Sequence, residues 1–152
     1  MSKDSIKLVA RNRKARHEYH ILEELEAGLV LLGSEVKSLR EGNASLSDSY
    51  ARLERGEVWL HNLHIGTYGP AGPEAHEHKR RRKLLLHRQE IRRLIGKVEQ
   101  AGLTLIPLEI YFREGVAKLK LALAKGKKQR DKREDIKRRE AEREVRRARK
   151  AR

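Results

Sequence analysis

Residues 103–123 read LTLIPLEIYFREGVAKLKLAL, two apolar runs on either side of the polar triplet Arg113–Gly115. In the second run, leucines at every other position alternate with Lys118, Lys120 and Ala122. This alternation predicts a strand with one buried face, and the triplet joins it to the preceding strand as a hairpin. Pro107 has no N–H group to donate to a sheet, so its strand is expected at an edge or bulged there.

A second hairpin is expected upstream, where the runs 45–54 and 57–65 flank Arg55 and Gly56. Glycine accepts a positive φ, which suits a two-residue connection. In the second run Trp59, His61, Leu63 and Ile65 fall on one face. We expect Trp59, together with Tyr111 and Phe112, to lie in the core.

The N-terminal third of the chain mixes strand-like and helical patterns. Residues 1–16 are a basic leader, either a first strand or a flexible arm, and strand-like runs at 17–25 and 29–32 are separated by Ala27 and Gly28. A tight connection is predicted at that separation. Ser34 is a suitable N-cap for a short helix ending at Gly42, which leaves Lys37 and Arg40 outward.

A surface loop and one longer helix complete the pattern. Two glycines and two prolines within residues 67–78 predict the loop. Apolar residues at 91, 94, 95 and 98 recur at helical spacing, and Gly102 supplies the stop. Hairpins and short helices within 1–124 predict a single domain, mainly β, built as a small closed β-barrel of the oligonucleotide-binding type.

The composition points to a polyanionic partner. The 152 residues include 37 Lys or Arg against 22 Asp or Glu, a net charge of +15, and no cysteine. Nucleic acid is the commonest partner of so basic a protein. Without cysteine there are no disulfides or thiolate metal sites. Because no apolar run approaches the roughly 18 residues of a membrane span, and the N-terminus lacks a signal-peptide core, we expect a cytoplasmic location.

Residues 125–152 form a basic tail with fifteen Lys or Arg against six Asp or Glu. Apart from alanines, only Ile136 and Val145 are apolar, so the tail cannot bury enough surface to offset its ordering entropy. Asp131 and Glu134 nevertheless have capping-box spacing, and several Glu–Arg pairs lie four residues apart. We expect a tail that is disordered when free and helical when bound.

Four segments resemble the bacterial SsrA-binding protein family, also called small protein B. They are NRKARHEYHI from Asn12, LEAGLVLLGSEVKSLREGNASLSDSYA from Leu25, RRKLLLHRQEI from Arg81, and KGKKQRDKRE from Lys125. The resemblance implies an oligonucleotide-binding-fold barrel that binds the tRNA-like domain of transfer-messenger RNA. It further implies delivery of that RNA, with elongation factor Tu and GTP, to stalled ribosomes for trans-translation.

The resemblance also assigns residues to the RNA. Positions that the family uses to hold the RNA fall on Asn12, Glu26 and Leu85, with Arg13 and Lys14 in the same basic segment. From the residues alone, Asn12 is a turn residue, Glu26 an exposed strand end, and Leu85 a core residue or a packing support for the loop that touches RNA. The basic run can reach phosphates on its chemistry alone, and its members are Arg81, Arg82 and Lys83.

In the tail, the family's decoding contribution maps onto Gly126, Lys127, Lys128, Arg130, Asp131, Lys132 and Arg133. We expect these residues to bind the decoding region of small-subunit ribosomal RNA, and residues 135–152 to become helical in the empty message channel. Some relatives carry His where this chain has Arg130, so a role that needs an imidazole there is in doubt.

Other classes of function fit the residues less well. His17, Glu18 and His20 could form a ribonuclease pair, and His76 with His78 could bind a metal, but no further ligands or nucleophile motif appear. We therefore expect no catalysis, cofactor or metal, and a monomer. A ribosomal or general RNA-binding barrel with a basic extension is the alternative that composition leaves open.

Overall fold

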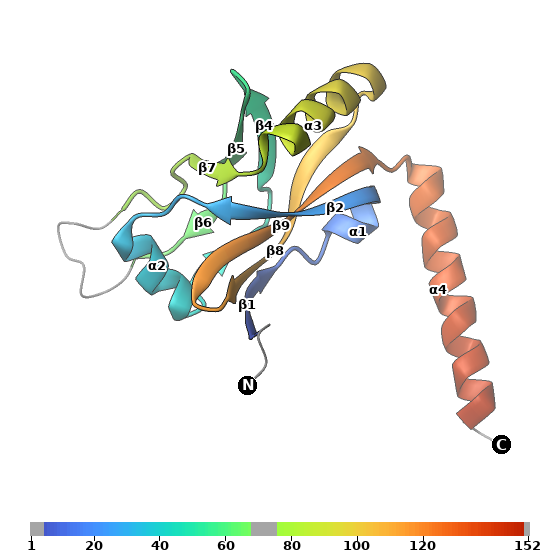
Figure 1. The fold of residues 1–152 in the computed structure, drawn as a ribbon. Coiled ribbons are helices and arrows are strands. Elements are labelled where there is room, and N and C mark those ends of the chain that lie inside the picture. Colours follow the sequence, from blue (N-terminus) through green and yellow to red (C-terminus); the bar gives the residue numbers. More distant parts are fainter. Residues whose placement is uncertain (1–4, 68–75, 151–152) are drawn as a thin grey trace.

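The computed structural model describes residues 5–67 and 76–150, apart from the side chains of residues 100, 101 and 129–131. These described residues form nine strands and four helices (Figure 1). The strands are β1 (Ile6–Arg11), β2 (Tyr19–Leu29), β3 (Ala44–Ser45), β4 (Tyr50–Glu54), β5 (Glu57–His61), β6 (His64–Ile65), β7 (Arg82–Leu85), β8 (Thr104–Arg113) and β9 (Val116–Gly126). The helices are α1 (Ala15–Glu18), α2 (Gly33–Arg40), α3 (Arg88–Ala101) and α4 (Gln129–Lys150).

The predicted β8–β9 hairpin is confirmed, with a turn one residue shorter than the predicted triplet because Arg113 pairs with Val116. Its two-residue turn holds Glu114 at φ 50 and Gly115 at φ 80, and pairing runs from Arg113 with Val116 back to Thr104 with Ala124. The register shifts between Pro107 and Glu109, which confirms the predicted bulge.

Strand pairing returns on itself around the core. Neighbouring strands follow the order β8, β4, β5, β7, β2 and β9, and β9 pairs again with β8, while β1 adds to the outer edge of β8. The core inside this ring contains the alternating residues Leu119, Leu121 and Leu123. A second apolar cluster contains Ala15 of α1 together with Ile106, Leu108, Ala122 and Ala124. The mainly β prediction is therefore confirmed.

Several boundary predictions are also confirmed. Arg55 at φ 51 and Gly56 at φ 76 form the turn between β4 and β5, and Gly102 at φ 61 ends α3. Tyr111 and Phe112 are buried, whereas Lys37 and Arg40 lie outward on α2. The leader forms strand β1. Of the predicted loop 67–78, residues 68–75 lie outside the described residues.

The predicted connection at Ala27 and Gly28 is wrong, because β2 runs unbroken through both residues. Gly28 pairs with Leu85 on one side and Lys118 on the other. A Cβ atom on Gly28 would lie 3.2 Å from the Cβ of Leu85. The glycine thus permits a close approach of two strands rather than a turn.

The predicted burial of Trp59 is also wrong. Val58 and Leu60 are the fully buried residues of β5, so Trp59 and His61 face outward. Asn62 adopts a left-handed φ of 62, which breaks the alternation and sends Leu63 and Ile65 back into the core. One residue with positive φ therefore separates two strands that the sequence pattern joined.

The predicted N-cap of α2 is shifted by two residues. Leu32 is the N-cap, and its N–H donates to Glu35 Oε1 at 2.8 Å. Ser34 lies inside the helix, with its Oγ 3.0 Å from Nδ1 of His76. Because His76 Nε2 lies 2.9 Å from the carbonyl oxygen of Ile65, this imidazole is tied to the fold at both nitrogens.

A buried ion pair joins α2 to β7. Glu35 and Arg82 are both completely buried, and Arg82 Nε donates to Glu35 Oε2 at 2.5 Å. Arg82 also donates to the carbonyl oxygens of Leu63 at 2.7 Å and Arg80 at 2.9 Å. Burial alone would raise the pKa of Glu35, but hydrogen bonds from Arg80 and Leu32 and the charge of Arg82 lower it.

The basic tail is a helix in this structure. Figure 1 shows α4 projecting from the end of β9 away from the strands. Its two larger apolar side chains, Ile136 and Val145, are 42% and 51% exposed. That the tail is disordered when free stays a prediction. None of the helices among the described residues is long and apolar enough to cross a membrane.

Removal of one partner from the buried pair should be costly. We expect Arg82→Met to lower the free energy of unfolding by about 3–5 kcal/mol, because the buried Glu35 carboxylate would keep Arg80 at Oε1 but lose its buried partner at Oε2. Urea unfolding monitored by circular dichroism measures this loss. The double change Glu35→Leu with Arg82→Met should recover part of it, and Arg40→Gln on the exposed side of α2 should cost about 0.5 kcal/mol or less. A loss below about 1 kcal/mol for Arg82→Met would contradict this account of the pair.

Candidate RNA interface

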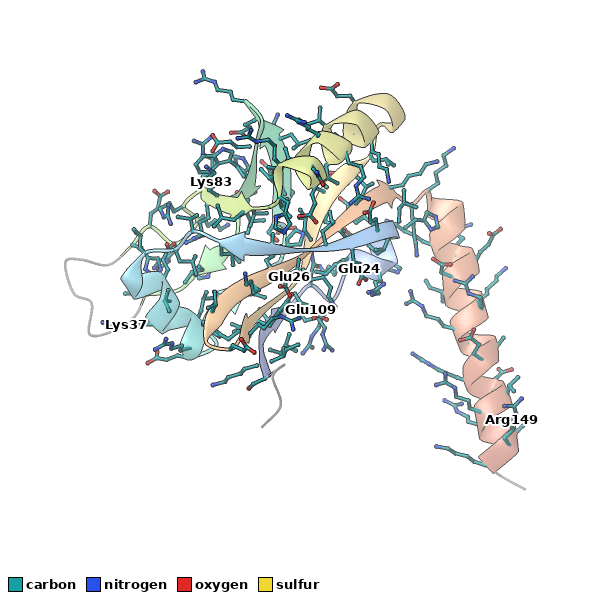
Figure 2. All side chains as sticks on the ribbon, in the orientation of Figure 1. Glu24, Glu26, Lys37, Lys83, Glu109 and Arg149 are labelled. Atoms are coloured by element: carbon teal, nitrogen blue, oxygen red, sulfur yellow. The ribbon has the colours of Figure 1, made fainter. Side chains whose placement is uncertain are left out.

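Glu26 lies at the centre of a hydrogen-bonded group on the outer face of the sheet. Tyr111 Oη donates to Glu26 Oε2 at 2.5 Å, and Arg113 Nε donates to the same oxygen at 3.0 Å. Figure 2 shows Glu26 beside Glu24 and Glu109 on this face. The Glu26 side chain is 38% exposed, so its other oxygen remains within reach of a ligand.

The electrostatics of this group keep Glu26 ionised and Tyr111 neutral. The hydrogen bond from Tyr111 lowers the pKa of Glu26, and Arg113 adds to the effect against the opposing influence of burial. Burial, together with the hydrogen bond to Glu26, raises the pKa of Tyr111 to about 12. The carboxylate is therefore a fixed acceptor near neutral pH, able to receive hydrogen bonds from the edge of a base.

Asn12 is held at the bulge of β8. Its Nδ2 donates to the carbonyl oxygen of Pro107 at 3.0 Å, and its backbone N–H donates to the carbonyl oxygen of Leu108 at 2.8 Å. Among the described residues, Oδ1 of Asn12 takes part in no hydrogen bond. Asn12 thus combines the turn role expected from its type with an acceptor that a ligand can use.

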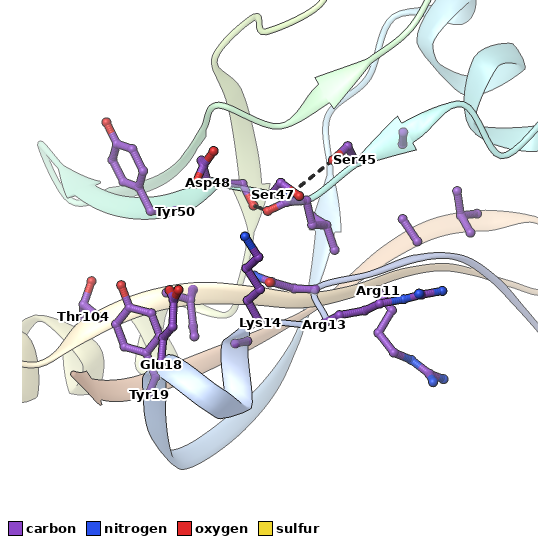
Figure 3. A pocket seen from close by; sticks show the side chains of 18 of the residues that line it. Arg11, Arg13, Lys14, Glu18, Tyr19, Ser45, Ser47, Asp48, Tyr50 and Thr104 are labelled. Carbon is purple, nitrogen blue, oxygen red and sulfur yellow. Dashed lines mark hydrogen bonds between the residues drawn. The ribbon is translucent and has the colours of Figure 1, made fainter. Parts of the chain in front are cut away.

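A cleft of about 970 Å³ opens beside Asn12 (Figure 3). One wall is the segment 11–19, with Arg13, Lys14 and Tyr19, and the other is the serine-rich segment 44–50. Figure 3 shows Lys14 extending from the first wall toward Ser47 and Asp48. Within the part of the chain that the structure describes, Arg13 and Lys14 form no ion pair, so both are available to phosphate.

The segment 81–85 divides between surface and core. Arg81, Lys83 and Leu85 face outward, and Leu85 is 52% exposed, so the prediction that Leu85 lies in the core is wrong. Arg82 is completely buried against Glu35, so its assignment to RNA phosphates is also wrong. The reason is strand alternation, which turns every second residue of β7 inward.

Lys127 ties the start of the tail to the body. Its ammonium donates to the carbonyl oxygen of Arg16 at 2.8 Å and forms an ion pair with Asp135, and its side chain is only 5% exposed. Arg138 reaches the other oxygen of Asp135 at 2.8 Å. The hydrogen bond from Lys127 lowers the pKa of Asp135, and the charge of Arg138 assists. Lys127 therefore fixes the start of α4 to the body and leaves little of its side chain accessible to a ligand. We call this set of contacts the Lys127 joint.

The other tail positions differ in what they present. Gly126 ends β9, whereas Lys128 and Arg133 are exposed around the beginning of α4 and Lys132 is half-buried there. The side chains of Arg130 and Asp131 lie outside the described residues, so their assignment is not tested. No group of three or more metal-ligating side chains that could hold an ion occurs in the described part of the chain.

Comparison with known proteins places this arrangement in a family. The family model described as SmpB protein matches residues 9–151. The SsrA-binding protein of Desulforudis audaxviator is 60% identical over 148 residues, with 97% of each chain covered. That of Pelotomaculum thermopropionicum is 59% identical over 144 residues, covering 95% of this chain and 94% of the relative. This chain belongs to the SmpB protein family.

A solved structure adds the architectural comparison. It is described as "tmRNA-SmpB: a journey to the center of the bacterial ribosome", with a TM-score of 0.66 and 52% sequence identity. The match covers 83% of this chain and 92% of that one. At this identity, the likeness extends to sequence as well as fold.

Sequence reasoning missed the partners of the site residues. Tyr111 and Arg113 lie 85 and 87 residues from Glu26, so only the pairing of β8, β9 and β2 brings them together. In the cleft, Ser45, Ser47 and Asp48 lie within the family-like segment that begins at Leu25, but no role was assigned to them. Their clustering of short polar side chains in a turn was a further signal.

The Glu26 group should make stability depend on pH in a defined direction. Folding lowers the pKa of Glu26, so the stability that its carboxylate contributes is present above the ordinary pKa of 4.5 and is lost as pH falls through the folded value. Glu26→Gln should therefore be less stable than the wild type at pH 7, with the gap closing below pH 4.5. Urea unfolding across this range measures it.

Tyr111→Phe provides the matched background for this measurement. Without the phenol hydroxyl, the cost of Glu26→Gln at pH 7 should shrink, because the two groups share one hydrogen bond. A gap that does not vary with pH would show that the carboxylate charge plays no part.

The Lys127 joint should control order at the base of α4. We expect Lys127→Met to speed amide hydrogen exchange in the first turns of α4, since this ion pair and Arg138 hold Asp135. Lys137→Met, at an exposed position of the same helix, is the control and should leave exchange nearly unchanged. Equal protection in both variants would contradict the joint.

Proposed function

We propose that this protein binds the tRNA-like domain of transfer-messenger RNA and brings it to stalled ribosomes for trans-translation. The observation that carries the proposal is the family match over residues 9–151, which spans both the body and the tail. Relatives named SsrA-binding protein and the solved structure with transfer-messenger RNA support it. The net charge of +15 suits an RNA partner.

The body, an oligonucleotide-binding-type barrel over residues 1–124 in this proposal, holds the RNA. Phosphates are met by exposed cations, and Glu26 and Asn12 supply the polar groups that recognise base edges or ribose. Leu85 packs against the RNA as an apolar contact near Gly28. The cations are Arg13, Lys14, Arg81 and Lys83.

The tail over 125–152 acts on the ribosome. Lys128, Lys132 and Arg133, with Gly126, Arg130 and Asp131, engage the decoding region of small-subunit ribosomal RNA. The rest of α4 lies in the empty message channel, where RNA phosphates neutralise its excess charge and favour the helix over a disordered free state. Lys127 contributes by fixing the joint from which the helix starts.

The remaining expectations belong to the same proposal. The protein works in the cytoplasm as a monomer and without a cofactor. It is not an enzyme, since its role is to place an RNA that elongation factor Tu delivers with GTP. The chemistry of peptide transfer and GTP hydrolysis is left to the ribosome and that factor.

Selective binding tests the body's role. The full-length protein should bind the tRNA-like domain of transfer-messenger RNA more tightly than alanine tRNA or a plain duplex, compared at the highest salt where binding survives. Glu26→Ala and Asn12→Ala should each weaken the selective complex about tenfold or more. Equal affinity for all three RNAs, insensitive to both changes, would leave a general RNA-binding barrel.

Truncation after Lys128 separates the two parts in the same experiment. Strand β9 ends at Gly126, so this truncation removes α4 and leaves the sheet complete. It should retain RNA affinity within about tenfold and lose tagging in a reconstituted translation reaction. Tagging by the truncated protein would defeat the tail's proposed role.

A further inference from the structure

The outer face of β4, β5 and β7 carries a layer of aromatic and charged side chains. Ala51, Val58, Leu60 and Leu84 point into the core, so the alternate residues of the same strands point out. We call this surface the β4–β5–β7 outer face, and it consists of Tyr50, Arg52, Glu54, Glu57, Trp59, His61, Arg81 and Lys83.

Two planar stacks lie side by side on this face. The guanidinium carbon of Arg81 is 4.1 Å from the centre of the Trp59 ring. Next to it, the rings of Tyr50 and His61, opposite one another on β4 and β5, stack with centres 5.2 Å apart and planes 8° from parallel. Trp59 and His61 are two residues apart on β5, so the two stacks are neighbours.

One carboxylate orients both stacks. Glu54 Oε1 lies 2.9 Å from Nε2 of His61, and Glu54 Oε2 accepts from Nη1 of Arg81 at 2.5 Å. The imidazole and the guanidinium are thus held in place before any ligand arrives. Rigid planar groups lose little rotamer entropy on binding, which favours stacking with an incoming ring.

Cations border the Trp59 ring along the sheet. In the cross-strand register Trp59 lies between Arg52 of β4 and Lys83 of β7. Lys83 pairs with Glu57 but keeps 39% of its side chain exposed, whereas Arg52 pairs with no carboxylate in the described part of the chain. A flat ring between two accessible cations matches the alternation of base and phosphate in an unpaired strand.

We propose that the β4–β5–β7 outer face binds an unpaired stretch of RNA. A base stacks on the Trp59–Arg81 pair, and the adjoining phosphates are held by Arg52 and Lys83. Duplex RNA fits poorly, because its base faces are already covered by their neighbours. An acidic protein segment would use the cations but not the rings. This proposal extends the proposed function, with which it shares Arg81 and Lys83, by adding Trp59 and Arg52 as a site for any unpaired RNA.

Trp59 is the single tryptophan of the chain, so it reports directly on this surface. We expect saturable quenching of its fluorescence when an oligouridylate of about twelve nucleotides, within the site sizes of single-strand binders, is added to the full-length protein. Arg52→Gln should weaken binding and reduce the slope of log affinity against log salt by about 0.7. Trp59→Leu should weaken binding about tenfold, measured by anisotropy of a labelled oligonucleotide.

Controls separate this surface from general charge effects. Arg40→Gln, an exposed change on α2, should leave both quenching and affinity within about twofold of the wild type. A hairpin duplex of similar length should bind without quenching. If Trp59→Leu unfolds, Arg52→Gln still tests the proposal, because Arg52 lies outside the core.

Three outcomes would overturn it. The oligonucleotide could bind with unchanged Trp59 fluorescence, Arg52→Gln could behave like Arg40→Gln, or polyglutamate could quench as strongly as RNA, which would indicate an acidic protein partner. The oligonucleotide assay uses no transfer-messenger RNA, and the selectivity assay depends on Asn12 and Glu26. Failure of one proposal is therefore distinguishable from failure of the other.

Discussion

The buried pair between Glu35 and Arg82 is the constraint on which the outer surfaces depend. Strand alternation means that an inward Arg82 forces Arg81 and Lys83 outward. A slip by one residue would turn Arg82 outward, break its hydrogen bond to Glu35 and expose a buried leucine. The register of β7, and with it the direction of every cation near Trp59, is thereby specified by electrostatics rather than by hydrophobicity alone.

Much of the fold could be predicted from the sequence, because the patterns concerned are local. Alternating leucines located the β8–β9 hairpin, Pro107 its bulge, and Gly102 the end of α3. Most of the predictions that failed involve distant partners, although the break at Asn62 is local. The residues around Arg82 do not indicate that its partner Glu35 lies 47 positions away in the chain. Those around Gly28 do not indicate that Leu85 packs against it. The residue type of Asn62 gives little indication that it ends a strand. The site residues came from the family resemblance, but their supporting contacts required the folded chain.

Charge is distributed unevenly between the two parts of the molecule. On the body, many cations face a carboxylate across neighbouring strands, as Lys120 does with Glu24 and Glu109. Such pairs are individually weak, yet they reduce the net field of the sheet. Unpaired cations that include Arg13, Lys14 and Arg52 remain accessible on the body. The tail has far fewer acidic residues than basic ones. The body is thus suited to localised contacts and the tail to a broad polyanionic surface.

The joint at Lys127 has a mechanical consequence. With 22 residues at a rise of 1.5 Å each, α4 is roughly 33 Å long. The contacts of Lys127 hold this helix near its N-terminal end. A rotation of the helix axis by about 10° at its N-terminal end moves the C-terminal end by about 6 Å, which is close to the pitch of one helical turn. Small shifts around the ammonium group of Lys127 therefore produce large displacements at the C-terminal end of α4. The position of that end is determined by the contacts at the start of the helix.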